Sequence, residues 1–326
     1  MFFQNMSMAA QQVAILYLIV AVGFIADRIG IFKQSTAKMS NDLLFYVITP
    51  TVIVQSFLNM EFNKETISSF LLAFLCMFAT LTVGILIVIP FFRKDGSNST
   101  IYKYAVSYGN MGYMALPLCQ SLLGSEGVFY CSAGVVAFNI LSFVHGIWLM
   151  KKGTDSDEGF KIKSIILNPG VLSVAVGLPL FILGVDLPEI IGGAVTHISN
   201  LNTPLAMIFL GTYIANADLK SMFIQKQNYI VSILKLLVLP GVMFCIFKLI
   251  GITGTLITAC MISASVPSAT NTVMFAAKYG KDTGVASTVV AFCSLLSVLT
   301  IPVMIALSHV WYKKTSLLWY FADGCL

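Results

Sequence analysis

Residues 109–117 read GNMGYMALP and residues 263–271 read SASVPSATN, and these two stretches decide how the chain is interpreted. Each lies near the middle of an apolar segment that is long enough to form a helix, and each contains a proline, Pro117 or Pro267. Proline removes a helical hydrogen bond and clashes with the preceding turn, and glycine weakens a helix further. Both segments are therefore predicted to be interrupted helices.

The composition around these stretches is that of an integral membrane protein. Of the 326 residues, 58% are hydrophobic and 10% are charged, whereas soluble domains have about 45–50% and about 25%. Apolar runs of the length that crosses a bilayer recur from end to end. The sequence predicts an all-α integral membrane fold with ten transmembrane helices, at 8–29, 39–60, 66–91, 102–122, 125–150, 164–184, 187–214, 226–250, 254–278 and 283–311.

Basic residues predict the orientation of these helices. Most of the 19 lysines and arginines lie in the loops that follow the odd-numbered segments. Cytoplasmic loops are enriched in Lys and Arg, so these loops should be cytoplasmic and both termini extracytoplasmic. We expect a multi-pass protein of the cell (plasma or inner) membrane. The net charge of +5 then reflects topology, and no nucleic-acid partner is expected.

Two short motifs recur at one common spacing of 154 residues. Thr49-Pro50 returns as Thr203-Pro204, and the VVAF of 135–138 returns at 289–292. Five helices per half is an odd number, so the second half must be inserted upside down, as in the inverted repeats of secondary transporters. The predicted organisation is a first five-helix repeat, a short cytoplasmic linker, a second repeat and a C-terminal tail, at 1–150, 151–163, 164–312 and 313–326.

Paired interruptions at matching places of two halves point to a transporter's binding site. Backbone groups freed inside the bilayer must be paired by protein, water or solute. The N-terminus of a half-helix also offers N–H groups and a partial positive charge, which suit an anion. The alternative is an ordinary kink, and for Asn139 it is interhelical hydrogen bonding. The predicted substrate-binding residues are Asn110, Gly112, Pro117, Asn139, Pro267 and Asn271.

Lys235 is the plainest charge inside a predicted span, where a charged side chain costs about 2.5–3.5 kcal/mol on insertion scales. It is a candidate charge partner for an anionic solute, or part of a proton-linked state. The alternatives are that its side chain extends toward the cytoplasmic face or pairs with an interior carbonyl group.

The sequence contains no motif that indicates catalysis or the binding of a cofactor or metal. The chain has no HExxH, Walker loop or GxSxG motif and no paired intramembrane aspartates, so we expect neither an enzyme nor a bound cofactor or metal. Six cysteines lie inside apolar runs and are expected to be free, buried packing residues: Cys76, Cys119, Cys131, Cys245, Cys260 and Cys293.

Over nearly its whole length the chain resembles the auxin efflux carrier family in its short bacterial form. The resemblance rests on an ordered set of motifs. These are Thr49-Pro50, Gly109-Asn110 followed by Pro117, Asn168-Pro169, Thr203-Pro204 leading to Leu210-Gly211, and Pro267 followed by FAAKY at 275–279.

The resemblance implies that the fourth and ninth helices cross at their unwound points, with the solute site beside the crossing. Asn110 and Asn139 match asparagines that line the family's substrate site, and Pro117 and Pro267 match its crossover prolines. It also implies a scaffold of the first, second, sixth and seventh helices, homodimerisation through that scaffold, and an elevator-like movement of the remaining bundle. Bacterial members are associated with dicarboxylates such as malate or malonate, and plant members with auxin, a monocarboxylate.

The predicted function is a secondary carrier of a small organic anion, working in the lipid bilayer by uniport or by coupling to protons or sodium. Two alternatives stay open. A solute sensor could use the same fold, and a sodium/proton antiporter could use a similar crossed fold. Such an antiporter should have aspartates at the crossing, where this chain has Asn110 and Asn271. The sequence does not define the coupling ion.

Overall fold

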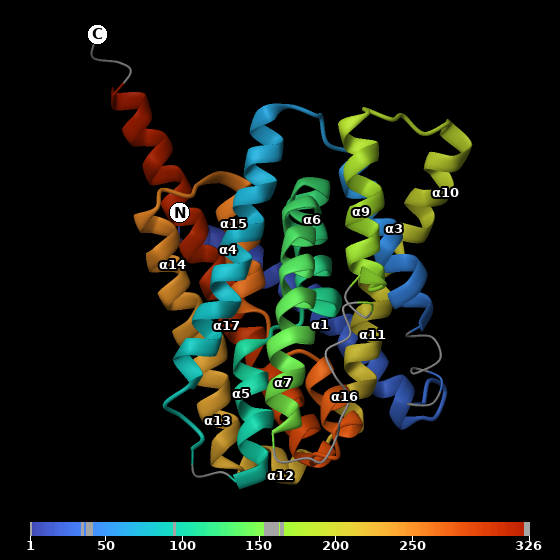
Figure 1. Cartoon of the computed structure of the whole chain (residues 1–326), viewed down its shortest axis with the longest axis vertical. Coiled ribbons are helices and arrows are strands. Elements are labelled where there is room, and N and C mark those ends of the chain that lie inside the picture. Colours follow the sequence, from blue (N-terminus) through green and yellow to red (C-terminus); the bar gives the residue numbers. More distant parts are fainter. Residues whose placement is uncertain are drawn as a thin grey trace.

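The computed structural model describes residues 2–33, 36, 42–93, 96–152, 163 and 166–322, and the regular elements in these residues are all helices (Figure 1). In chain order they are α1 (Phe2–Arg28), η1 (Leu44–Ile48), α3 (Thr49–Leu58), α4 (Lys64–Val88), η2 (Gly96–Asn98), α5 (Ser99–Ser107), η3 (Met111–Ala115), α6 (Leu116–Leu141), η4 (Ser142–Gly146), α7 (Ile147–Lys151), α9 (Pro169–Ile182), α10 (Glu189–Asn200), α11 (Asn202–Ala215), α12 (Leu219–Ile224), α13 (Lys226–Ile233), η5 (Leu234–Val238), α14 (Leu239–Leu249), α15 (Gly254–Ser265), α16 (Asn271–Lys278) and α17 (Thr283–Ala322). Most of the predicted linker 151–163 lies outside the described residues.

Several of these helices are long and apolar enough to cross a membrane. In the described chain the long runs are Ala10–Arg28, Lys64–Val88, Met111–Lys151, Lys226–Leu249 and Thr283–Ser308. Shorter apolar helices cover Leu44–Leu58, Pro169–Ile182 and Gly254–Ser265. Together they make the chain an all-helical, multi-pass membrane protein. The last helix, α17, continues to Ala322, beyond the end expected at 311.

The long run Met111–Lys151 reverses direction within α6. Gly124 has φ +63°, a left-handed conformation that favours glycine. A methyl group on Gly127 would lie 2.9 Å from the carbonyl oxygen of Cys119. Eight residues of continuous helix would separate these positions by about 12 Å. The segments before and after Gly124 are therefore two packed helical runs.

Three helices with a basic residue in the last turn end on the same side of the molecule. The C-terminal ends of α1, α7 and α16 lie at the lower end of Figure 1, together with α12. Each of these three helices has a basic residue in its last turn: Arg28, Lys151 and Lys278. Three of the basic residues that predicted the orientation thus lie on one side of the bundle, whereas Lys248 ends α14 on the other side.

The α1–α11 contact brings two helix backbones together. A Cβ atom on Gly211 would overlap the carbonyl oxygen of Val20, and one on Gly23 would overlap the carbonyl oxygen of Ile208. Only glycine permits this approach, and close backbone packing is a main source of helix association in membranes.

The six predicted cysteines are free, and five of them are buried. Cys245 is exposed, which corrects the expectation that it packs inside the protein. Hydropathy does not distinguish a core-facing position from a lipid-facing one, because both surroundings are apolar.

Candidate functional site

The two stretches that opened the sequence analysis meet each other in space. Helix α5 ends at Ser107 and η3 begins at Met111, while α15 ends at Ser265 and α16 begins at Asn271. The backbones between these helix ends run antiparallel, with an isolated bridge between Gly109 and Ser268. We call residues 108–110 and 266–270 the crossing.

Two backbone hydrogen bonds hold the crossing together. The N–H of Ala269 donates to the carbonyl oxygen of Tyr108 at 2.9 Å, and the N–H of Asn110 donates to that of Pro267 at 2.8 Å. Polar backbone groups that leave a helix in an apolar interior need partners. The two segments supply partners to each other.

A pocket of about 400 Å³ lies beside the crossing. This volume falls within the range of ordinary small-ligand sites. Its walls come from η1 and α3 on one side and from the crossing, η3, α6, η4 and α16 on the other, with the start of α9 between them. The polar residues that line it are Asp42, Tyr46, Thr49, Asn110, Tyr113, Asn139, Asn168 and Asn271.

Among these polar groups, Asn110 has the side-chain amide whose orientation is best defined. Its Oδ1 accepts a hydrogen bond from the N–H of Tyr113 at 3.2 Å and so caps η3. Because a backbone N–H requires an acceptor, this bond fixes which end of the amide is the oxygen. The remaining Nδ2 is buried and has no hydrogen-bond partner among the described residues. An unpaired buried donor is costly, and here it belongs to a residue that lines a pocket.

Asn139 and Asn168 approach each other from α6 and the start of α9. Oδ1 of Asn168 accepts a hydrogen bond from the N–H of Gly170 at 2.9 Å. A methyl group on Gly170 would lie 2.7 Å from Val135 Cγ1 and 3.5 Å from Asn139 Nδ2. Gly170 therefore allows α9 to approach α6 closely enough for the two asparagines to share one pocket wall.

The structure places the other predicted residues differently. Gly112 and Asn271 line the pocket, and a methyl group on Gly112 would have nothing within 4 Å. Pro117 and Pro267 do not line it. Pro117 follows the π-helical turn η3 inside the helical run Met111–Lys151, so its missing N–H removes a helical hydrogen bond there. Pro267 contributes its carbonyl oxygen to the crossing.

Lys235 also lies outside the pocket lining, but it is close to the crossing. Its side chain is 1% exposed. A methyl group on Gly109 would lie 3.0 Å from Lys235 Nζ. The alternative that the Lys235 side chain extends to the cytoplasmic face is therefore wrong.

Several lining residues were not selected as site residues from the sequence. Aromatic rings from Phe45, Tyr46, Tyr113, Phe138 and Phe143 surround the polar groups. Aromatic residues are common in every apolar segment of this chain, so no local signal distinguished these rings. Asn168-Pro169 did carry a signal, because a helix-capping asparagine before a proline marks a helix start.

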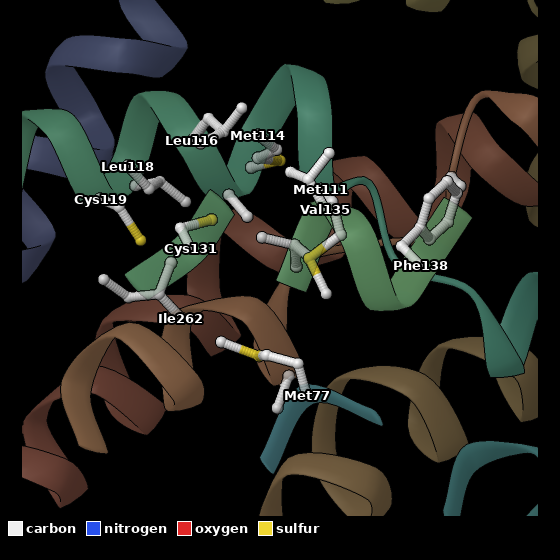
Figure 2. Close-up of a cluster of buried hydrophobic side chains, with 14 of the residues drawn as sticks. Met77, Met111, Met114, Leu116, Leu118, Cys119, Cys131, Val135, Phe138 and Ile262 are labelled. Atoms are coloured by element: carbon white, nitrogen blue, oxygen red, sulfur yellow. The ribbon is translucent and has the colours of Figure 1, made fainter. Parts of the chain in front are cut away.

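An apolar cluster supports the pocket from the interior. Figure 2 shows Met111 and Val135 within this cluster, together with Phe138, and these three residues also line the pocket. Cys119 and Cys131, from the two runs of α6, lie in the same cluster (Figure 2). The pocket wall therefore has a close-packed apolar layer behind it, with the amide groups placed at its surface.

A multi-pass helical fold with a polar pocket beside two non-helical segments that meet is typical of a membrane transporter. The chain belongs to the membrane transport protein family, whose model matches residues 8–161 and 158–305. This is the family of the auxin efflux carriers, so the resemblance seen in the sequence is confirmed. Members of this family are transporters and not enzymes.

Individual relatives agree with this assignment. An uncharacterized transporter of Methanocaldococcus jannaschii is 26% identical over 303 residues, which cover 89% of this chain and 95% of that protein. An uncharacterized transporter of Methanothermobacter thermautotrophicus is 23% identical over 293 residues, or 87% and 93% of the two chains. A Rhizobium meliloti protein with the provisional name of malonate transporter is 22% identical over 282 residues, covering 84% and 85%.

Proposed function

We propose that this protein is a secondary carrier of a small organic anion, such as a mono- or dicarboxylate, which binds in the pocket beside the crossing. The observation that carries the proposal is the buried Nδ2 of Asn110. It is a hydrogen-bond donor without a partner among the described residues, so its ligand must present an acceptor. A carboxylate does so with up to four lone-pair sites.

The remaining wall of the pocket fits the same ligand. Asn139 Nδ2 can donate a hydrogen bond, and the apolar rings suit a short carbon chain. The carboxylate of Asp42, which is exposed, also lines the pocket. It would repel an anion in its immediate vicinity, so we place the solute at the asparagine end. The provisional name of the Rhizobium meliloti relative, malonate transporter, is consistent with a short carboxylate.

The proposal extends to the architecture. We propose ten transmembrane helices in two inverted five-helix repeats, with the fourth and ninth helices broken at the crossing. The antiparallel backbone contact between Gly109 and Ser268 supports this arrangement. An elevator-like movement, a homodimer, and extracytoplasmic termini in a cell membrane complete the proposal. The position of Arg28, Lys151 and Lys278 on one side supports the orientation.

The test uses one substitution that separates the acceptor role of the Asn110 amide from its donor role. Asn110→Asp keeps an oxygen to cap η3 but removes the donor and adds a negative charge. We expect purified wild-type protein to show a rise in melting temperature with malonate or a related carboxylate. Asn110→Asp should lower the ligand-free melting temperature, because the new charge is buried, and the folded variant should lose the ligand-induced rise. Uptake of the same carboxylate into proteoliposomes should be lost in parallel.

A matched control is available at another helix start. Asn63 caps α4 by accepting a hydrogen bond from the N–H of Thr66 at 2.7 Å, and it lies outside the pocket. Asn63→Asp should leave the carboxylate response unchanged. A carboxylate response that survives in Asn110→Asp would contradict the proposed site. Melting-temperature shifts without accumulation in vesicles would favour a solute sensor over a carrier.

A further inference from the structure

The pocket beside the crossing has a single charged side chain among its described lining residues, the carboxylate of Asp42. The other polar residues of the lining are neutral, and no lysine, arginine or histidine occurs among the lining residues that the structure describes. The hydrogen-bond donors available to an anion are therefore amide groups. The one full charge in the described lining has the same sign as the proposed solute.

The lysines closest to this lining in the described chain do not neutralise Asp42. Lys278 follows the lining residue Met274 by about one turn of α16, but its Nζ lies 5.5 Å from the centre of the Tyr279 ring. Lys235 is buried behind the crossing, and neither lysine lines the pocket. In the described part of the chain, Asp42 forms no hydrogen bond or ion pair with another residue. Its charge therefore acts on a solute in the pocket.

The amide groups and the carboxylate lie at different depths. Asn110 and Asn139 are 2% and 5% exposed, whereas Asp42 is exposed. A solute that gives one carboxylate to the buried amides must extend the rest of its chain toward the exposed side of the pocket. A second carboxylate would then approach Asp42, where like charges repel each other.

We propose that Asp42 sets the charge of the solute, so that the pocket accepts carboxylates with one negative charge and selects against dicarboxylates. This inference rests on the proposed function, because it defines the substrate class of the same pocket. Selectivity here comes from a repulsive group and not from an additional contact. The malonate specificity in the provisional name of the Rhizobium meliloti relative is then not expected of this chain.

The first test compares two solutes of nearly equal size. Malonate carries two carboxylates, and malonamate carries one carboxylate and one neutral amide. Dissociation constants are obtained from the rise in melting temperature of the purified protein with increasing solute. The wild type should bind malonamate about five- to ten-fold more tightly than malonate, the scale of one unit-charge repulsion in a partly exposed site. High salt should reduce this ratio, because Asp42 is exposed and its charge is screened.

The Asp42→Asn variant removes the charge and keeps the size of the side chain. The ratio of the two dissociation constants should fall toward one, mainly because malonate binds more tightly. Asp186→Asn is the matched control, since Asp186 is an exposed aspartate outside the lining of this pocket, and it should keep the wild-type ratio. Tighter binding of malonate than of malonamate by the wild type, or an unchanged ratio in Asp42→Asn, would overturn the inference.

The second test measures the potential in the pocket without a transported solute. Met274 lines the pocket and is 51% exposed, so Met274→Cys places a thiol there, in a chain whose Cys245 and Cys325 are changed to serine. The thiol is treated with a cationic trimethylammonium-ethyl thiosulfonate or an anionic sulfonatoethyl thiosulfonate. Adding Asp42→Asn should lower the ratio of cationic to anionic reaction rates by about five-fold.

The two tests separate the two proposals. If neither malonate nor malonamate, nor any related carboxylate, changes the melting temperature, the proposed function fails, and the reagent ratio alone decides whether Asp42 controls the charge in the pocket. A reagent ratio that Asp42→Asn leaves unchanged would refute the role of Asp42 even if carboxylates bind.

Discussion

The α1–α11 contact and the crossing join parts of the chain in opposite ways. At the α1–α11 contact, Gly23 and Gly211 bring two continuous helices into backbone contact. At the crossing, two interrupted helices meet through backbone hydrogen bonds. The first region is filled by backbone atoms. The second is bordered by a pocket, by a buried lysine, and by hydroxyl groups that have no hydrogen-bond partner among the described residues.

The difference shows how a membrane protein can separate rigidity from binding. Close glycine packing leaves no polar side chain to satisfy and no space for a ligand, so it suits a fixed support. Unwound backbone is tolerated in a membrane only where protein or a water-filled cavity pairs its polar groups. The crossing meets that condition, because its two segments pair their backbone groups with each other.

The largest effect is expected from filling the glycine contact. Gly211→Leu would overlap the backbone of Val20 and force α1 and α11 apart, which should cost about 3 kcal/mol or more. We expect loss of the monodisperse purified protein and a strongly lowered melting temperature. Gly193→Leu in α10 is the matched control, since a methyl group there has nothing within 4 Å, and it should be tolerated.

A smaller effect on stability, with a large effect on function, is expected at the crossing. Gly109→Ala places a methyl group 3.0 Å from Lys235 Nζ, so the lysine or the crossing must shift, at about 1–3 kcal/mol. Carboxylate uptake should fall more than the melting temperature suggests. Gly112→Ala, three residues away in open space, should melt like the wild type. Equal uptake by the two variants would remove the distinction between the tight and open sides of the crossing.

The smallest effect is expected at the polar edge of the glycine contact. Asn216 Nδ2 donates a hydrogen bond to Asp27 Oδ2 at 2.9 Å, and it joins the ends of α11 and α1 at an exposed position. Asn216→Ala should change the free energy of unfolding by about 0.5 kcal/mol or less. A much larger loss in chemical or thermal unfolding would mean that polar contacts, and not glycine packing, hold α1 against α11.

The sequence by itself determined the class, the family and much of the helix plan. Apolar length and charge are local properties, so the run predicted at 226–250 corresponds closely to the helical run Lys226–Leu249. The motifs at 109–117 and 263–271 likewise identified Asn110 and Asn271, both of which line the pocket. They were recognisable because asparagine, glycine and proline disturb a helix wherever it packs.

Only the tertiary structure decided which groups line the pocket and which serve the backbone. It excluded Pro117 and Pro267 from the pocket lining and brought Thr49, Asn168 and Gly170 into the site. It also placed Lys235 against Gly109. A helical pattern shows which residues are apolar, but the neighbour of each face depends on how distant helices pack. In a membrane this is hardest to read, because lipid and protein core are equally apolar.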